Sequence, residues 1–119
     1  MKLAPLLVAL ALAAAAPTTL AQGLHFLKNS PVSYFDDEDW RLMQEAIREA
    51  LDNNPDGEKV SWENPKTGHN GSVTPLNTYQ DFGTTCRRAR LFNEAESASG
   101  ASTFNFCKDT EEDRWKVAS

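Results

Sequence analysis

Two cysteines, Cys86 and Cys107, lie on either side of a predicted polar loop (93–100) rich in Glu, Ser and Ala. If the flanking segments form an antiparallel hairpin whose paired residue numbers sum to 193, the cysteines face each other within reach of a disulfide. This register gathers on one face Ala89, Leu91, Phe104 and Phe106, and on the cysteine face Arg88, Arg90, Thr103 and Asn105. A shift of one residue would break both features, so the sequence predicts this register.

The N-terminus indicates export. After Lys2, residues 3–16 are Leu, Ala and Val with one Pro, a run of the length of a signal-peptide core and too short to span a membrane. Small residues at Thr19 and Ala21 predict cleavage before Gln22. No second apolar stretch follows, so we expect no transmembrane segment after cleavage. An oxidising compartment favours a disulfide over a metal site, because the cysteines and the two histidines, His25 and His69, lack the spacing of paired metal ligands.

The mature chain, 98 residues long, is expected to form one domain. Without Lys2 it carries 11 basic and 17 acidic residues, a net charge of −6. Such an acidic chain argues against nucleic acid or anionic lipid as the main partner.

The pattern along the chain predicts one helix followed by strands. After a partly ordered leader (22–35), Asp36 is placed to cap a helix that ends near Asn53, before Pro55. Phe35 and Trp40 then take the two positions of a hydrophobic staple. The apolar face of the helix consists of Trp40, Met43, Ile47, Ala50 and Leu51.

Beyond Gly57 the period changes to two. Val60 and Trp62 mark a first strand, residues 70–80 a second with Val73, Leu76 and Tyr79 as its apolar members, and Trp115 and Val117 a last strand. Pro75 indicates an edge or a bulge. The predicted fold class is α+β: one N-terminal amphipathic helix packed on a four- to five-stranded antiparallel meander with one cross-strand disulfide. The domain is expected over 36–119, with core anchors Trp40, Trp62, Trp115, Phe104 and Phe106.

These signals occur in the order seen in a known bacterial family. Their order and spacing carry the resemblance: Trp62, Asn64-Pro65, Gly68, residues 71–75, Gly83 before Cys86-Arg87, then Cys107 and Trp115. The chain resembles the C-terminal domain of the bacterial seventeen-kilodalton surface antigen family, of the rickettsial outer-membrane antigen type. The resemblance implies a cell-envelope protein of a Gram-negative bacterium, without an established enzymatic activity.

The chain departs from the family pattern in three ways. It has no lipobox cysteine, no glycine-zipper segment and no Gly in the turn before Trp115. The first two departures favour a soluble periplasmic form over a membrane-anchored one.

One segment matches a calcium-loop template. Asp52, Asn54, Asp56 and Gly57, followed by Glu63, have the spacing of oxygen ligands in an EF-hand. Pro55 inside the loop and the chain breaks at Asn64-Pro65 and Gly68 exclude an exit helix. We therefore interpret the segment as a turn and expect no metal and no cofactor.

The polar cysteine face is the candidate binding patch, made of Arg88, Arg90, Thr103 and Asn105. A solvated strand face, paired with the acidic turns, is the simpler interpretation. No catalytic residues are predicted, because neither histidine has a nucleophile pattern beside it and both thiols are expected to be oxidised. The leading hypothesis is a non-enzymatic exported module, periplasmic or associated with the outer membrane, whose partner is another envelope protein or component. A secreted inhibitor or ligand-binding protein is the alternative, and a small hydrolase a third.

Overall fold

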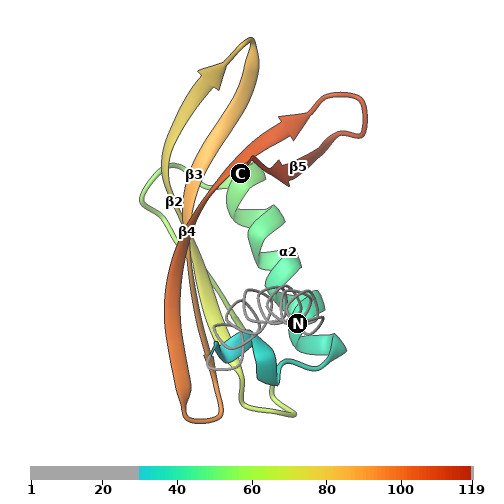
Figure 1. Cartoon of the computed structure of the whole chain (residues 1–119), viewed down its shortest axis with the longest axis vertical. Coiled ribbons are helices and arrows are strands. Elements are labelled where there is room, and N and C mark those ends of the chain that lie inside the picture. The colour runs from blue at the N-terminus through green and yellow to red at the C-terminus, as the bar shows by residue number, and fades with distance from the viewer. Residues whose placement is uncertain (1–29, 119) are drawn as a thin grey trace, which may run out of the picture.

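The computed structural model describes residues 30–118. The expected signal peptide and residues 22–29 of the leader lie outside this range. A 3-10 helix η2 (Pro31–Tyr34) and an α-helix α2 (Asp37–Asn53) precede five strands, whose bounds are β1 (Val60–Glu63), β2 (Asn70–Asp81), β3 (Thr84–Ala95), β4 (Ala98–Asp109) and β5 (Arg114–Val117). Figure 1 shows the helix in the hollow of a strongly twisted sheet.

The start of α2 is set by the residues that the sequence indicates. The Asp36 carboxylate accepts a hydrogen bond from the Asp39 backbone N–H at 2.8 Å, and the Asp39 carboxylate accepts one from the Asp36 backbone N–H at 2.9 Å. This reciprocal capping box satisfies donors that the first turn leaves free. The ring centroids of Phe35 and Trp40 lie 5.4 Å apart, so the predicted hydrophobic staple is confirmed.

The strands follow one another in an antiparallel meander of order β1-β2-β3-β4-β5. The predicted hairpin register is confirmed: Cys86 pairs with Cys107 and Arg90 with Thr103, and the two cysteines form a disulfide. The long polar loop expected over 93–100 is wrong, because β3 and β4 continue to Ala95 and Ala98. A two-residue turn is possible since Glu96 adopts a left-handed conformation, with φ of 57°.

A bulge interrupts β2 between Pro75 and Asn77, as the proline indicates. Val73 and Pro75 are buried against the helix side, but Leu76 is 42% exposed. Leu76 is an apolar member of β2, but it lies outside the core because it is three residues from Val73 and is at the bulge.

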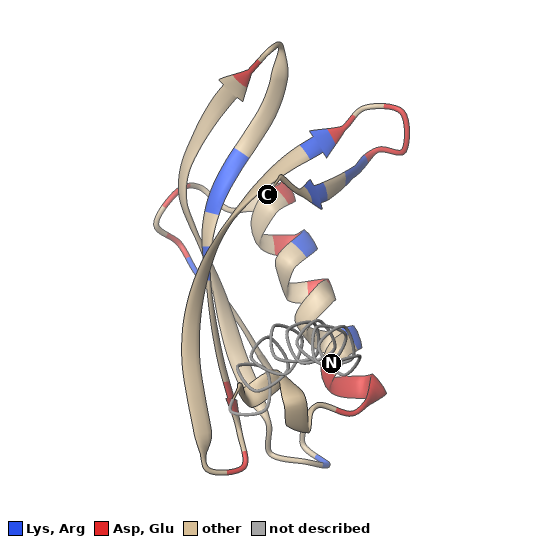
Figure 2. Ribbon diagram, in the orientation of Figure 1, with Lys and Arg blue, Asp and Glu red and all other residues tan. Residues whose placement is uncertain are grey.

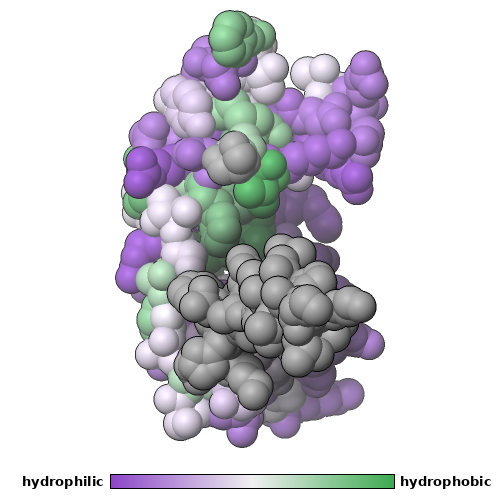
Figure 3. Space-filling view, viewed as in Figure 1, coloured by the Kyte–Doolittle hydropathy of each residue, from purple (hydrophilic) through white to green (hydrophobic). Residues whose placement is uncertain are grey.

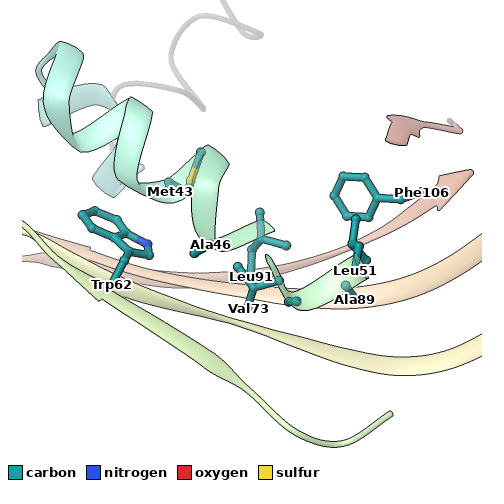
Figure 4. Close-up of a cluster of buried hydrophobic side chains, with 9 residues drawn as sticks. Met43, Ala46, Leu51, Trp62, Val73, Ala89, Leu91 and Phe106 are labelled. Atoms are coloured by element: carbon teal, nitrogen blue, oxygen red, sulfur yellow. The ribbon is translucent and has the colours of Figure 1, made fainter. Parts of the chain in front are cut away.

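The core lies between α2 and the sheet (Figure 4). Its buried members are Met43, Ala46, Ala50, Leu51, Trp62, Val73, Ala89, Leu91 and Phe106. Two predicted anchors are wrong: Trp40 is 40% and Phe104 38% exposed. The helix packs chiefly on β1 and β2, so the inner face of β4 between Ala98 and Phe104 stays largely uncovered. Among residues 30–118, no helix combines the length and apolar character needed to cross a membrane.

Candidate functional site

The predicted polar patch lies on the face of the sheet opposite α2. Across β3 and β4, Arg88 pairs with Asn105 and Arg90 with Thr103, two and four residues along the strands from the disulfide. Both arginines are exposed, and the guanidinium of Arg90 lies 5.9 Å from the ring centroid of Phe92. Figure 2 shows basic residues of β3 in blue. Within residues 30–118, neither Arg88 nor Arg90 forms an ion pair. The disulfide and the ladder hold the two strands together, so the patch has a fixed backbone.

The acidic turn before β5 does not neutralise these arginines. Its carboxylates pair instead with basic side chains of β4 and β5: Asp109 with Lys116, Glu112 with Arg114 and Lys116, and Asp113 with Lys108. The pairing of the patch with the acidic turns, expected from the simpler interpretation, is therefore not seen in the described part of the chain.

Arg87, the first residue of the arginine cluster, has a different place. Its side chain points to the helix side and is buried, 7% exposed, at the C-terminus of α2. Its guanidinium donates to the carbonyls of Ala50 at 3.1 Å, Leu51 at 2.8 Å and Asn54 at 2.7 Å. It also donates to the Asp56 carboxylate and the Thr78 hydroxyl, both at 2.9 Å.

These five bonds use every N–H of the guanidinium. They satisfy carbonyls that the end of a helix leaves unpaired and place a cation at the negative end of its dipole. Arg87 is thus a structural cap, and its spacing in sequence alone could not separate it from its exposed neighbours.

The residues of the calcium-loop match are drawn into other contacts. Asp56 accepts hydrogen bonds from Arg87 and Thr78, and Asp52 accepts one from the Trp115 indole at 2.7 Å. Strand β1 follows the turn where an EF-hand would have its exit helix. In the part of the chain that the structure describes, no group of three or more His, Cys, Asp or Glu residues could hold a metal ion.

A cluster around His69 was not found from the sequence. Its position between Gly68 and Asn70 predicts a turn, but His69 is 5% exposed and lies between two carboxylates. Its Nδ1 is 2.8 Å from Oδ2 of Asp39, and its Nε2 is 2.6 Å from Oε2 of Glu96. The ring also stacks on Phe35. The cluster joins the first turn of α2, the start of β2 and the tip of the β3–β4 hairpin, segments that no local sequence signal brings together.

The cluster holds charges of opposite sign. Hydrogen bonds with Glu96 and Asp39 raise the pKa of His69 above its usual value, against the effect of burial. Asp39 is 0% exposed, and this burial would raise the pKa of its carboxyl group. Four hydrogen bonds donated to the carboxylate nevertheless hold its pKa at about 2. The donors are the Asp36 backbone and the side chains of His69, Asn64 and Thr67. Because both ring nitrogens contact carboxylates, the imidazole acts as a clamp, and neither nitrogen is free to activate a nucleophile.

A groove of about 430 Å³ lies between α2 and the β4–β5 hairpin. Figure 3 shows hydrophobic atoms in the hollow beside the sheet and hydrophilic ones on the hairpin. The groove is lined by Ile47, Phe106 and Trp115, with charged side chains around them. Lys108 lies over the Trp115 ring, with its Nζ 5.3 Å from the ring centroid, on one side of the groove.

The sequence matches a family described as 17 kDa outer membrane surface antigen over residues 49–116, more than half of the chain. The chain belongs to this family. Proteins of this family named "17 kDa surface antigen" are 40% identical over 53 residues in Rickettsia prowazekii (strain Madrid E) and 42% identical over 53 residues in Rickettsia felis. Each of these matches covers 44% of this chain and 33% of the relative.

A further relative in Rickettsia canadensis is 39% identical over 46 residues, which cover 39% of this chain and 58% of the relative. The match thus spans about a third of the length of the first two relatives. No solved structure matches the chain. The family match includes the Arg87 cap, the arginine patch and the disulfide, whereas Asp39 lies before it.

Proposed function

We propose that this surface-antigen-like chain is a non-enzymatic, exported cell-envelope module whose outer sheet face binds an anionic group of another envelope component. The observation that carries the proposal is the pair of exposed arginines, Arg88 and Arg90, which have no acidic partner among residues 30–118. In a chain with a net charge of −5, two adjacent cations without counter-charges form a local positive site.

The neighbouring residues suit this purpose. Asn105 and Thr103 lie directly across from the two arginines and add hydrogen-bonding groups to the same face. Guanidinium groups bind carboxylates and phosphates through paired, charge-assisted hydrogen bonds. The bound group would therefore be a carboxylate or a phosphate on an envelope protein or polymer.

Two features favour binding over catalysis. Both cysteines of the chain are joined in the disulfide, so they offer no thiolate nucleophile. The buried histidine is held by carboxylates on both ring nitrogens. The disulfide also suits an oxidising compartment, which supports a periplasmic or outer-membrane-associated location.

The test compares two double variants of the exported chain. Arg88→Ser/Arg90→Ser removes the patch, and Arg48→Ser/Lys66→Ser removes the same two positive charges from exposed positions elsewhere. After crosslinking in intact cells, the partner recovered with the wild type should be lost with the first variant and kept with the second. Equal recovery with both variants would refute the role of the patch.

Fractionation of the same cells tests the location. Recovery with the periplasm or the outer membrane supports the module, whereas recovery only from the culture medium would favour a secreted inhibitor or ligand-binding protein.

A further inference from the structure

The first half of β4 is a free edge of the sheet. β5 pairs only with residues 106–109 of β4, and no described strand pairs with Ala98 to Phe104 on that side (Figure 1). Residues 99–104 are all exposed. An unpaired strand edge presents backbone groups that can extend a sheet.

The other long edge, along β2, is protected in the ways that natural sheets use. Pro75 and the bulge after it interrupt the ladder. The preceding loop covers this stretch, with the Gly57 N–H donating to the Pro75 carbonyl at 2.6 Å and the Thr78 hydroxyl donating to Asp56. The edge of β4 has none of these features: residues 98–107 contain no charge and no proline.

One hydrogen bond fixes which backbone groups point outward. The Ala118 N–H donates to the Asn105 carbonyl at 2.7 Å, so Asn105 faces the β5 side. Backbone groups alternate between the two sides of a strand. Therefore Ser99, Ala101 and Thr103 direct their N–H and C=O groups to the free edge, while the residues between them bond to β3.

We propose that a second copy of this chain pairs with this edge, through an antiparallel β4–β4 contact centred on Ala101. In this register Ala101 faces Ala101 of the second copy and Ser99 faces Thr103, which gives about six backbone hydrogen bonds. All outward groups of the three residues are then paired. Registers centred elsewhere leave some of them unpaired.

The side chains favour a second copy as the occupant. The two-fold axis sets this segment against itself, with Ala101 beside its own symmetry mate, which is unfavourable for a charged strand, but here the paired segment has no charge. On the inner face, Phe104, which is 38% exposed, comes beside Ala98 of the second copy and gains cover. The same pairing places the arginine patches of both copies on one face of a continuous sheet. A single strand pair is a small contact, so the association is reversible and concentration-dependent.

Sedimentation velocity of the purified chain over a range of concentrations tests the proposal. The wild type should shift from monomer to dimer as concentration rises. Ala101→Lys and Ala101→Glu each place like charges at the two-fold axis, and each should raise the dissociation constant at least tenfold. An equimolar mixture of the two variants should form a heterodimer. Asn77→Lys, at an exposed position of β2, adds the same charge and should dimerise like the wild type.

Because Ala101 is exposed on the outer face, each variant should fold as the wild type does. Circular dichroism of each variant checks this. A wild type that stays monomeric at millimolar concentration overturns the proposal. So does a dimer that Ala101→Lys leaves unchanged, or a mixture of charge variants that does not associate. Capture of another protein's strand at this edge by a monomeric chain would equally exclude the second copy.

Discussion

Replacing Arg87 by Met tests whether one buried side chain holds the end of α2 to the sheet. Methionine replaces the apolar stem but ends before the guanidinium group, so it removes all five donors. The carbonyls of Leu51 and Asn54 then lose their partner, whereas the Ala50 carbonyl still accepts from the Asn54 N–H at 3.1 Å. Asp56, whose side chain is 40% exposed, can return to water and contributes little.

The expected loss follows from these contacts. The buried Leu51 carbonyl left without a donor costs about 1–3 kcal/mol and the part-buried Asn54 carbonyl costs less, so the two together account for about 3 kcal/mol. The loss of a cation at the helix C-terminus acts in the same direction. For a domain of this size, such a change lowers Tm by about 12–24 °C.

The matched control is the next residue. Arg88→Met removes the same charge from an exposed position on the opposite face, so it should change stability by no more than about 0.5 kcal/mol. Urea unfolding followed by circular dichroism measures both variants. If Arg87→Met loses less than about 1 kcal/mol, or no more than Arg88→Met, then the cap does not stabilise the domain as we infer.

Three further measurements test other parts of the structure. A Cys86→Ser/Cys107→Ser variant should lose about 3 kcal/mol in urea unfolding, because the disulfide closes a loop with a sequence separation of 21; full stability would contradict this. In NMR, His69 should titrate above its usual pKa. The wild type should be more stable than Glu96→Gln, and this difference in unfolding free energy should be full below about pH 6.5 and decline as pH rises through the raised pKa of His69. A difference that grows with pH would contradict the contact between His69 and Glu96. Gly71→Ala should lower the unfolding free energy by about 1–3 kcal/mol, because the new Cβ would lie 2.5 Å from Asn93 Oδ1 and 2.7 Å from Trp62 Nε1. Gly100→Ala is the control, since its Cβ would meet no atom closer than 3.7 Å. Equal melting temperatures for the two variants would refute this crowding.

Where the signals are local, the sequence predicts the structure closely. The capping box at Asp36 and the break at Pro55 define α2, because both act within a few residues of the helix end. The hairpin register follows from the opposed cysteines and the period-two pattern, since one slip would reverse every side chain.

The candidate site is predicted only in part. Arg88 and Arg90 are placed correctly on the outer face by strand alternation alone. The burial of His69 could not be predicted, because its partners, Asp39 and Glu96, are 30 and 27 residues away. The long strands that bring Glu96 to the hairpin tip are likewise visible only in the folded chain.

The sequence by itself thus determined the helix, the order of the strands, the β3–β4 register and the disulfide, because these depend on neighbouring residues and on side-chain periodicity. Only the tertiary structure decided which apolar residues are buried and which charges are paired. The helix lies over β1 and β2, so Trp62 is in the core while Trp40 and Phe104 remain exposed. The same placement turns Arg87 into a buried cap and leaves Arg88 and Arg90 on the open face, a difference set by the position of α2 above the sheet.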